Sequence, residues 1–545
     1  MMRNLQEVCM SFRRLVAAAV LLVSSTAYGD APGVYALTGA TVHPVSGPDV
    51  SNGVVVIRNG LIEAAGANAT VPADATVIDL KGMHVYPGLI DAQTSLGFAS
   101  PAPRRGPGGG GGGGAAAAAR AERPAEPTAD SLAIRNANIS DDDAEARRAI
   151  GVTTVLIAPA SGIFNGQSAL VNLGSGPIES RVIKSPAALQ ISFNPRPTWT
   201  YPDSLMGVVS YIRQTFFDAQ QHVAATEIYG RSPAGYERPR ESPALDALRP
   251  VLRRDLPVVF VADSDTMMRR AMAIAKEMNV RYVLSGARGG YELAGELKNV
   301  PVLVSVRWPT APTDKEDRED QPLRVIRERQ LQPTTPSVLA KNGVQFALVS
   351  GAGKAGDFIP GIRKAIESGL SADDALRATT IAPARIFGVD RQLGTLERGK
   401  IANVIVSDKP LFEKEAKVRR VFVDGREIRL PADDRKRGDD APSTSPIDGT
   451  WALTVRAPEG SIAIQVTLHA EDGKVSGTFA GDRGSGDLRS GTFDGTAIDF
   501  AISANAQNDA EASDWVFRGT VTGNTMTGTV ATTIGNFEFS GSRSK

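Results

Sequence analysis

The chain has 545 residues, which is too long for one ordinary domain and predicts two or three. Its 60 basic and 60 acidic residues balance, so the composition gives no sign of a basic surface and argues against a nucleic-acid partner. The hydrophobic fraction of 42% is ordinary for a globular protein.

The N-terminus has the pattern of an export signal. Two arginines precede an apolar run over residues 15–23, and small residues follow at 27–29. We expect a signal peptide over residues 1–29, translated from Met1 or Met10, and a periplasmic or secreted protein. The run is too short to span a bilayer, and no later segment is apolar enough, so we expect no transmembrane anchor.

Cysteine chemistry is absent from the expected mature chain. Cys9 is the only cysteine and lies upstream of the apolar run, whereas a lipoprotein cysteine would follow it. Cleavage therefore leaves no disulfide, thiolate metal ligand or cysteine nucleophile.

Residues 33–84 alternate apolar and polar positions, and Asn59-Gly60 is a two-residue hairpin signal. From residue 85 to 387, short apolar runs alternate with helical patterns, which is typical of repeated strand–helix units. The expected strands are 153–157, 258–262, 282–284, 302–306 and 345–349, followed later by 403–407 and 419–424. The expected helices are 205–225, 266–278 and 372–379, with Ser371 as the N-cap of the last.

Two segments of biased composition interrupt these patterns. Residues 101–128 contain seven consecutive glycines followed by a run of five alanines, and we expect a disordered insertion rather than a phosphate-binding loop. Residues 431–446 are charged and rich in Pro and Ser, as in a linker. Beyond them, residues 447–545 consist of short turn-and-strand units and predict a separate all-β module, similar to lipocalin-like modules.

Several motifs in a fixed order carry a family resemblance. The first is Pro-Gly-Leu-Ile-Asp-Ala at residues 87–92, and the others are at 151–155, 166–167, 369–380, 383–388, 393–400 and 421–425. Together they resemble the metal-dependent amidohydrolase superfamily, in its imidazolonepropionase-like and exported dipeptidase-like branch. The resemblance implies an α/β fold: a distorted (β/α)8 barrel over residues 85–387. A β-sandwich built from residues 33–84 together with 388–430 would flank it.

The resemblance also implies where zinc or another divalent metal would bind, at the C-terminal ends of the barrel strands. The motif at 87–92 normally continues as His-x-His, but here it continues with Gln93 and Ser95. No lysine stands near residues 188–190, where some relatives carry a bridging carboxylated lysine. The ligand positions are occupied by Gln93, Ser95, Val261, Asp263, Gly286 and Gly351. Amides and hydroxyls are poor zinc ligands, and a single carboxylate holds a transition metal weakly, so we predict no cofactor.

Other routes to catalysis have little support in the sequence. His43, His84, His222 and His469 are the four histidines, and none matches a family ligand position. We expect His84 at the bottom of the barrel and His222 at the C-terminus of the helix from residue 205. A serine nucleophile needs a nearby base, and Lys354 beside the last strand is the main candidate for that role.

The sequence therefore favours a degenerate amidohydrolase that acts as a partner or binding subunit, without catalysis. Its partner would be an active paralogue or a second copy, and its ligand a small peptide or cyclic amide. Two alternatives remain: an active hydrolase of carbon–nitrogen bonds with an unusual metal set or none, and a periplasmic binding protein for small molecules or peptides. The candidate pocket residues are Gln93, Ser95, Gln167, Asp263, Ser285 and Ser350.

Overall fold

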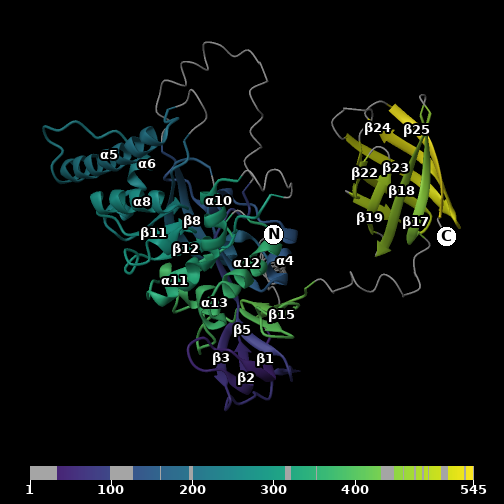
Figure 1. The fold of residues 1–545 in the computed structure, drawn as a ribbon, viewed down its shortest axis with the longest axis horizontal. Helices are drawn as coiled ribbons and strands as arrows, with labels where there is room; N and C mark the ends of the chain where they lie inside the picture. Colours follow the sequence, from purple (N-terminus) through teal and green to yellow (C-terminus); the bar gives the residue numbers. More distant parts are fainter. Residues whose placement is uncertain are drawn as a thin grey trace, which may run out of the picture. The chain divides into compact units, whose positions relative to one another are not determined.

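The computed structural model describes residues 33–98, 127–159, 161–195, 201–312, 321–351, 353–430, 447–457, 460–471, 474–481, 484–488, 490–504, 513–532 and 535–543. The expected signal peptide, nearly all of the glycine-rich insertion and the expected linker lie outside these residues. Among the described residues, no helix is both long and apolar enough to cross a membrane. The chain divides into two compact units, residues 1–431 and 432–545, each described by itself (Figure 1).

The first unit contains a sheet built from both of its ends. Its strand order is β16-β15-β14-β5-β1-β2-β3, with β4 paired to β1. Asn59-Gly60 forms the predicted turn between β2 and β3, and Asp424-Gly425 forms another between β15 and β16. The strands are β1 Tyr35–Val42, β2 Val50–Arg58, β3 Leu61–Gly66, β4 Thr76–Asp79, β5 His84–Pro87, β14 Val404–Ser407, β15 Val418–Val423 and β16 Arg426–Ile428.

The second sheet of this unit forms a nearly closed barrel of eight strands, which confirms the predicted distorted barrel class. Its order is β13-β12-β11-β10-β9-β8-β7-β6, and a bridge between Thr94 and Gly351 joins its two ends. The strands are β6 Leu89–Thr94, β7 Val152–Ile157, β8 Phe164–Asn172, β9 Val182–Ser192, β10 Val258–Ala262, β11 Tyr282–Gly286, β12 Val302–Ser305 and β13 Phe346–Val349.

Helices surround this barrel sheet (Figure 1). Ser371 caps α13 by accepting from the Asp374 N–H, as predicted. The α-helices are α3 Ala133–Asn136, α4 Asp141–Ala149, α5 Leu205–Arg231, α6 Pro243–Asp246, α7 Arg249–Leu252, α8 Asp265–Glu277, α10 Leu323–Leu331, α11 Thr335–Lys341, α12 Ala355–Glu367, α13 Ala372–Ala378 and α14 Ile381–Ile386. Short 3-10 turns are η1 Ile178–Arg181, η2 Gly290–Glu292 and η3 Gln332–Thr334.

The regular strand–helix alternation fails at one place. Strand β8 runs antiparallel to both β7 and β9, and no α-helix separates these three strands. The sequence analysis missed β8 because polar residues interrupt it, although all nine of its residues are buried. Inside the barrel wall, hydrogen bonds from Gln167, Ser168 and Asn172 allow a mixed sequence to form a core strand.

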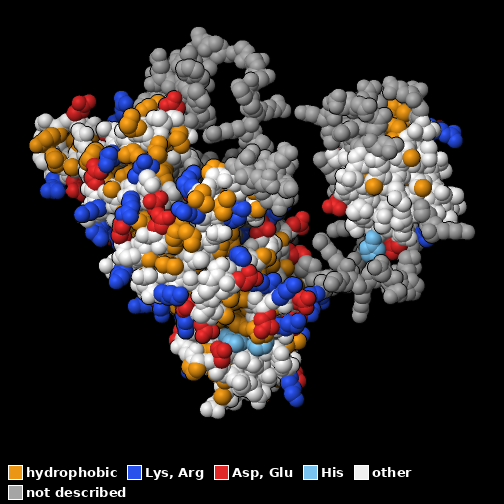
Figure 2. Space-filling view, viewed as in Figure 1, with side chains coloured by type: hydrophobic (Ala, Val, Ile, Leu, Met, Phe, Trp, Pro, Cys, Tyr) orange, Lys and Arg blue, Asp and Glu red, His pale blue; other side chains and the backbone are white. Residues whose placement is uncertain are grey.

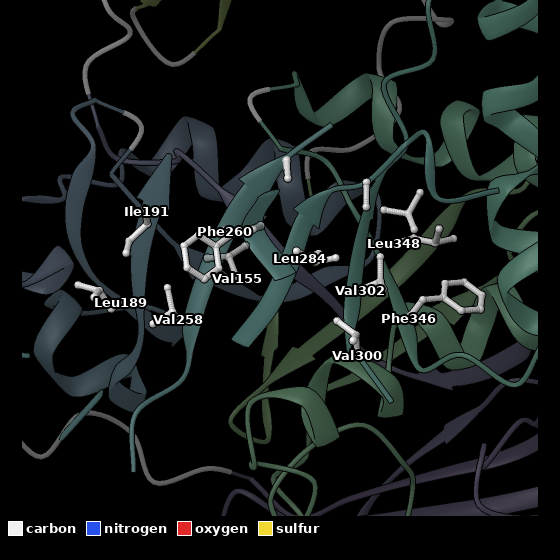
Figure 3. Packing of buried hydrophobic residues seen from close by; sticks show 14 of the residues in the cluster. Val155, Leu189, Ile191, Val258, Phe260, Leu284, Val300, Val302, Phe346 and Leu348 are labelled. Carbon is white, nitrogen blue, oxygen red and sulfur yellow. The ribbon is translucent and has the colours of Figure 1, made fainter. Parts of the chain in front are cut away.

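Alternating side chains give the barrel two apolar layers. Val258, Phe260 and Leu284 belong to the large core formed with the helices, and Figure 3 shows them projecting from neighbouring strands. Their neighbours Val259 and Val283 belong to a smaller cluster inside the barrel. This period of two also determines which residues at the strand ends face the interior.

The second unit is all-β, and its strand order β18-β17-β25-β24-β23-β22-β21-β19-β20, with β18 also paired to β19, returns the sheet on itself. Its core includes Trp451, Trp515 and Phe517. Its likeness to lipocalins stays a prediction. The strands are β17 Gly449–Ala457, β18 Gly460–Glu471, β19 Lys474–Gly481, β20 Gly484–Asp487, β21 Ser490–Phe493, β22 Ala497–Ala504, β23 Ser513–Thr522, β24 Thr525–Thr532 and β25 Gly535–Arg543.

Candidate functional site

A cavity of about 240 Å³ lies at the C-terminal ends of the parallel barrel strands. Strand ends β6, β10, β11, β12 and β13 all contribute to its lining. Barrel enzymes place their chemistry at this face, because the loops that follow the strands converge there. The lining residues are Gln93, Thr94, Ser95, Ala158, Pro159, Asn165, Ser192, Asn194, Val261, Asp263, Ser285, Gly286, Arg288, Ser305, Arg307, Val349 and Gly351.

The structure brings together all six positions at which the resemblance places metal ligands. They are Gln93, Ser95, Val261, Asp263, Gly286 and Gly351, and every one lines this cavity. Four of the six residues of the candidate pocket also line it: Gln93, Ser95, Asp263 and Ser285. Residues from distant parts of the sequence meet here because each follows a barrel strand.

A bulge in β6 explains how three consecutive residues of one strand reach the cavity. The pairing of β6 with β7 shifts between Asp91 and Thr94, so the strand gains a residue relative to its neighbour. A regular strand would send Thr94 to the opposite face from Gln93 and Ser95. The bulge changes this alternation: all three residues line the cavity, while Thr94 Oγ1 accepts from Arg147 Nη2 at 3.4 Å.

Asp263 has a partner of its own in the cavity. Its Oδ2 accepts from Arg288 Nη2 at 2.9 Å. Its Oδ1 occupies the space where a side chain at Gly286 would begin, since a Cβ built there would lie 2.0 Å from that oxygen. Gly286 also has a φ of +92°, which side chains other than glycine rarely adopt. The position is therefore closed to histidine unless Asp263 and the backbone both move.

The sequence analysis missed two arginines of the cavity. Arg288 donates to Asp263 and, through Nη1, to the main-chain oxygen of Arg307 at 2.8 Å. Arg307 follows β12 and lines the cavity. Both arginines lie just beyond predicted strands. Because the loops after barrel strands form the active-site face, their positions in the sequence alone could have identified them.

Gln93 is held by a chain of hydrogen bonds inside the barrel. Its Nε2 donates to Gln190 Oε1 at 3.2 Å, and Gln190 Nε2 donates to Ser168 Oγ at 3.0 Å. Gln190 is fully buried and stands in the segment where some relatives carry a bridging lysine. Gln93 Oε1 and Asn165 Oδ1 are buried, and each lacks a donor within the described part of the chain.

The structure places Gln167 and Ser350 away from the cavity, which corrects two of the predicted pocket residues. Gln167 lies on the antiparallel β8, and its amide donates to the Ala129 oxygen at 3.0 Å. Ser350 is 1% exposed and donates to the Asp91 carboxylate. Ser350 was assigned to the mouth because it follows the last expected barrel strand, whereas Gln167 belongs to the motif at 166–167. Both instead serve buried hydrogen bonds.

Ser350 belongs to a buried ion-pair network that closes the barrel. Arg147 Nη1 lies 2.7 Å from Asp91 Oδ2 and 2.9 Å from Ser350 Oγ, and Arg147 Nη2 reaches the Gly353 oxygen at 3.1 Å. Burial raises the pKa of the Asp91 carboxyl, while the adjacent guanidinium opposes that shift. The network connects β6, α4 and the end of β13, so its role is structural. It also occupies the Ser350 hydroxyl, which leaves Lys354 no serine to activate at this position.

The histidines lie outside the cavity. His43 and His84 lie 3.0 Å apart between Nε2 and Nδ1 in the first sheet, and His43 Nδ1 lies 2.8 Å from Asp49. Figure 2 shows histidine atoms at the surface of this part of the unit. Burial and the neighbouring His43 lower the pKa of His84. The sequence analysis placed these residues separately, because strand pairing between β1 and β5 is not visible from spacing.

His222 lies within α5, nine positions before its last residue, because the helix extends beyond the expected end at residue 225, and it contacts Asp246 at 3.2 Å.

These residues do not fit a tightly held transition metal. Gln93 and Ser95 offer neutral oxygens, and Val261, Gly286 and Gly351 offer no donor atom in their side chains. The carboxylate of Asp263 is already paired with Arg288. Throughout the described residues, no group of three or more His, Cys, Asp or Glu side chains is arranged to hold a metal ion.

Comparisons with known proteins point to one family. A profile described as the amidohydrolase family matches residues 327–428. The crystal structure of an amidohydrolase from Thermotoga maritima MSB8 is 26% identical, covers 73% of this chain and 100% of its own, and superposes with a TM-score of 0.61. A putative prolidase from Bifidobacterium longum is 14% identical over 73% of this chain and 96% of its own, with a TM-score of 0.44. The last similarity is too low to support a conclusion about this chain.

Proposed function

Because the chain belongs to the amidohydrolase superfamily, we propose that it is a catalytically inactive member that binds a small polar molecule at the barrel mouth. Hydrolysis in this superfamily depends on a metal that activates water and polarises the scissile carbonyl. No position that would hold the metal carries histidine, and only one carries a carboxylate. We therefore propose that the chain retains the binding site of the family but not its hydrolytic activity.

The arrangement around Asp263 carries this proposal. A metal at the mouth would have to compete with Arg288 for the only carboxylate of the six positions. It would gain no ligand from Gly286, where Asp263 itself fills the space of a Cβ atom. A site that had only lost some ligands would retain room for a metal. In this mouth the ion pair between Arg288 and Asp263 occupies the only carboxylate.

The experiment is a hydrolysis assay on the full chain with dipeptides and cyclic amides, measured by release of amine or carboxylate. We expect no turnover above the protein-free rate, with or without added zinc or manganese. Turnover that disappears in Asp263→Asn would instead support the alternative of an active hydrolase with an unusual metal set or none. The matched control is Asp265→Asn, which changes a neighbouring half-buried carboxylate that does not line the cavity.

We also propose that the protein is exported and acts beside an active paralogue or as a homo-oligomer. The export signal over residues 1–29 supports the first statement, and the loss of catalytic residues from an otherwise intact barrel supports the second. Fractionation of cells and copurification with a sister protein that retains His-x-His test the two statements separately.

A further inference from the structure

Helix α5 carries apolar residues on two opposite faces. Its core face buries six residues, all of them within 208–219. On the opposite face, Met206 is 81% exposed, Phe217 47% and Ile228 45%. These three residues, which we call the outer stripe, are spaced 11 positions apart, close to three helical turns, so they lie on one line along the helix. The solvent face of a helix ordinarily carries polar residues, so a regular second apolar line favours contact with a partner.

The second half of α5 has little support from the rest of the unit. No residue of 220–231 is buried, and this half is held by ion pairs such as that between Glu227 and Arg253 at 3.3 Å. Figure 1 shows α5 extending to the outer edge of the unit, and Figure 2 shows hydrophobic side chains at the surface there. Most helix stability in proteins comes from packing of an apolar face. A partner on the outer stripe would supply that packing.

The outer stripe is symmetric about Phe217. Met206 and Ile228 lie 11 positions before and after it, which is about 16.5 Å along the helix in each direction. A two-fold axis at Phe217 makes two copies of the helix antiparallel. It brings Phe217 against the partner's Phe217 and Met206 against the partner's Ile228. A two-fold interface requires such a self-complementary surface, so the spacing favours a second copy of this chain.

A groove beside the outer stripe fits the same arrangement. Its volume is about 450 Å³, and it lies between α5 and α8, with Met206 and Val209 on one side and Ala273 and Ile274 on the other. Antiparallel pairing brings the partner's Ile228 to this end of α5. The branched aliphatic side chain would then pack among apolar groups in each of the two symmetry-related grooves.

The charges along α5 are also compatible with antiparallel pairing. The two-fold axis places Arg231, the last residue of the helix, opposite the partner's Asp203, just before the start of the helix, and both residues are exposed. Arg213 lies opposite the uncharged Gln221. None of the five charged residues within 203–231 meets a like charge. The opposed helix dipoles add a further small stabilisation.

We propose that α5 forms the interface of a homodimer, in which the outer stripes of two copies pack antiparallel about a two-fold axis at Phe217. This interface rests on the proposed homo-oligomer and names its contact surface. The 27 residues of α5 span about 40 Å, and a strip about 10 Å wide along them covers on the order of 400 Å² per copy. A standard interface buries about 800 Å² per partner, so we expect a weak dimer with a Kd of about 10–100 μM.

Disulfide cross-linking of the full chain tests the symmetry of the pairing. Cys9→Ser first removes the only native cysteine. In that background, Phe217→Cys places two thiols at the axis, and we expect a disulfide-linked dimer on mild oxidation. Met206→Cys alone should not cross-link, because antiparallel pairing holds the two thiols about 33 Å apart. Met206→Cys combined with Ile228→Cys should cross-link, because each thiol then faces its counterpart on the other copy.

Sedimentation equilibrium over about 1–200 μM measures the dimer without cross-linking. Phe217→Glu brings two carboxylates together at the axis and should raise the Kd at least about tenfold. The matched control is Leu323→Glu, which changes an apolar residue of α10 that is 61% exposed, and it should leave the Kd unchanged. Arg231→Asp should weaken the dimer, and adding Asp203→Arg should restore it. Thermal unfolding of each variant verifies that it retains the wild-type fold.

The possible failures are distinguishable. A chain that stays monomeric throughout this concentration range overturns both the α5 interface and the proposed homo-oligomer, and the paralogue becomes the favoured partner. A dimer that Phe217→Glu and Leu323→Glu leave equally unchanged overturns the α5 interface alone, because the homo-oligomer then uses another surface. Cross-linking of Met206→Cys by itself would show parallel pairing and contradict a two-fold axis at Phe217.

Discussion

Two neighbouring groups of polar residues in the barrel differ sharply in how their hydrogen bonds are satisfied. Asp91, Arg147 and Ser350 are buried and donate to or accept from one another. Gln93 lies two residues after Asp91 on β6, and its Oε1 and the Oδ1 of Asn165 on β8 have no donors among the described residues. A satisfied network stabilises the fold, whereas a buried oxygen without a donor adds no such stabilisation. The comparison predicts that the buried ion-pair network controls the stability of the fold and that the residues of the cavity control ligand binding.

The largest effect is expected from breaking the buried ion pair. Arg147→Met leaves the Asp91 carboxylate in the barrel wall without its cation, and we expect the free energy of unfolding to fall by about 3–5 kcal/mol. Urea denaturation of the variant measures it. A loss below about 1 kcal/mol would mean that the pair does not close the barrel as described.

A smaller effect is expected at the rebuilt mouth. Gly286→Ala places a methyl group 2.0 Å from Asp263 Oδ1 and imposes a side chain on a residue with a φ of +92°. We expect a loss of about 1–3 kcal/mol in the free energy of unfolding. In the Asp263→Ala background the contact disappears, so Gly286→Ala should reduce the free energy of unfolding less there than in the wild-type protein. Equal losses would assign the whole effect to the backbone.

The histidine pair predicts a dependence of stability on pH. Burial, followed by the neighbouring His43, lowers the pKa of His84 below its ordinary value of 6.5. The unfolded chain therefore binds a proton more readily than the folded chain, and stability present above pH 6.5 is lost as the pH falls through the folded-state pKa. The slope should stay well below about 1.4 kcal/mol per pH unit, because His84 is partly solvated.

His84→Gln should flatten the fall in stability between neutral and mildly acidic pH. His469→Gln, in the second unit, is the matched control and should retain the wild-type profile. A profile that is the same in all three proteins would exclude His84 as the source.

The smallest effect on stability is expected from Arg307→Gln, although this variant should impair ligand binding. The side chain is exposed, so the free energy of unfolding should change by less than about 0.5 kcal/mol. Urea denaturation compares it with Arg147→Met. A large loss of stability at Arg307 would remove the distinction between the two groups of residues.

The sequence predicted the barrel and part of its mouth for physical reasons. Strand β10 begins and ends at the predicted residues, because a continuous apolar run marks a strand buried on both faces. Gln93, Asp263 and Ser285 were correctly brought together, since the ends of parallel strands meet at one face. Strand β8 and Arg147 were missed because their polar groups are satisfied only by distant partners. No local pattern encodes a contact such as that between Asp91 and Ser350, which are 259 positions apart.

The central claim is that the inherited metal site is gone. Metal stoichiometry, measured by plasma mass spectrometry on untagged protein after incubation with zinc and manganese and then dialysis, tests it most directly. We predict less than about 0.1 equivalents of any transition metal per chain. Close to one equivalent retained through dialysis would contradict the account, and the active-hydrolase alternative would then take its place.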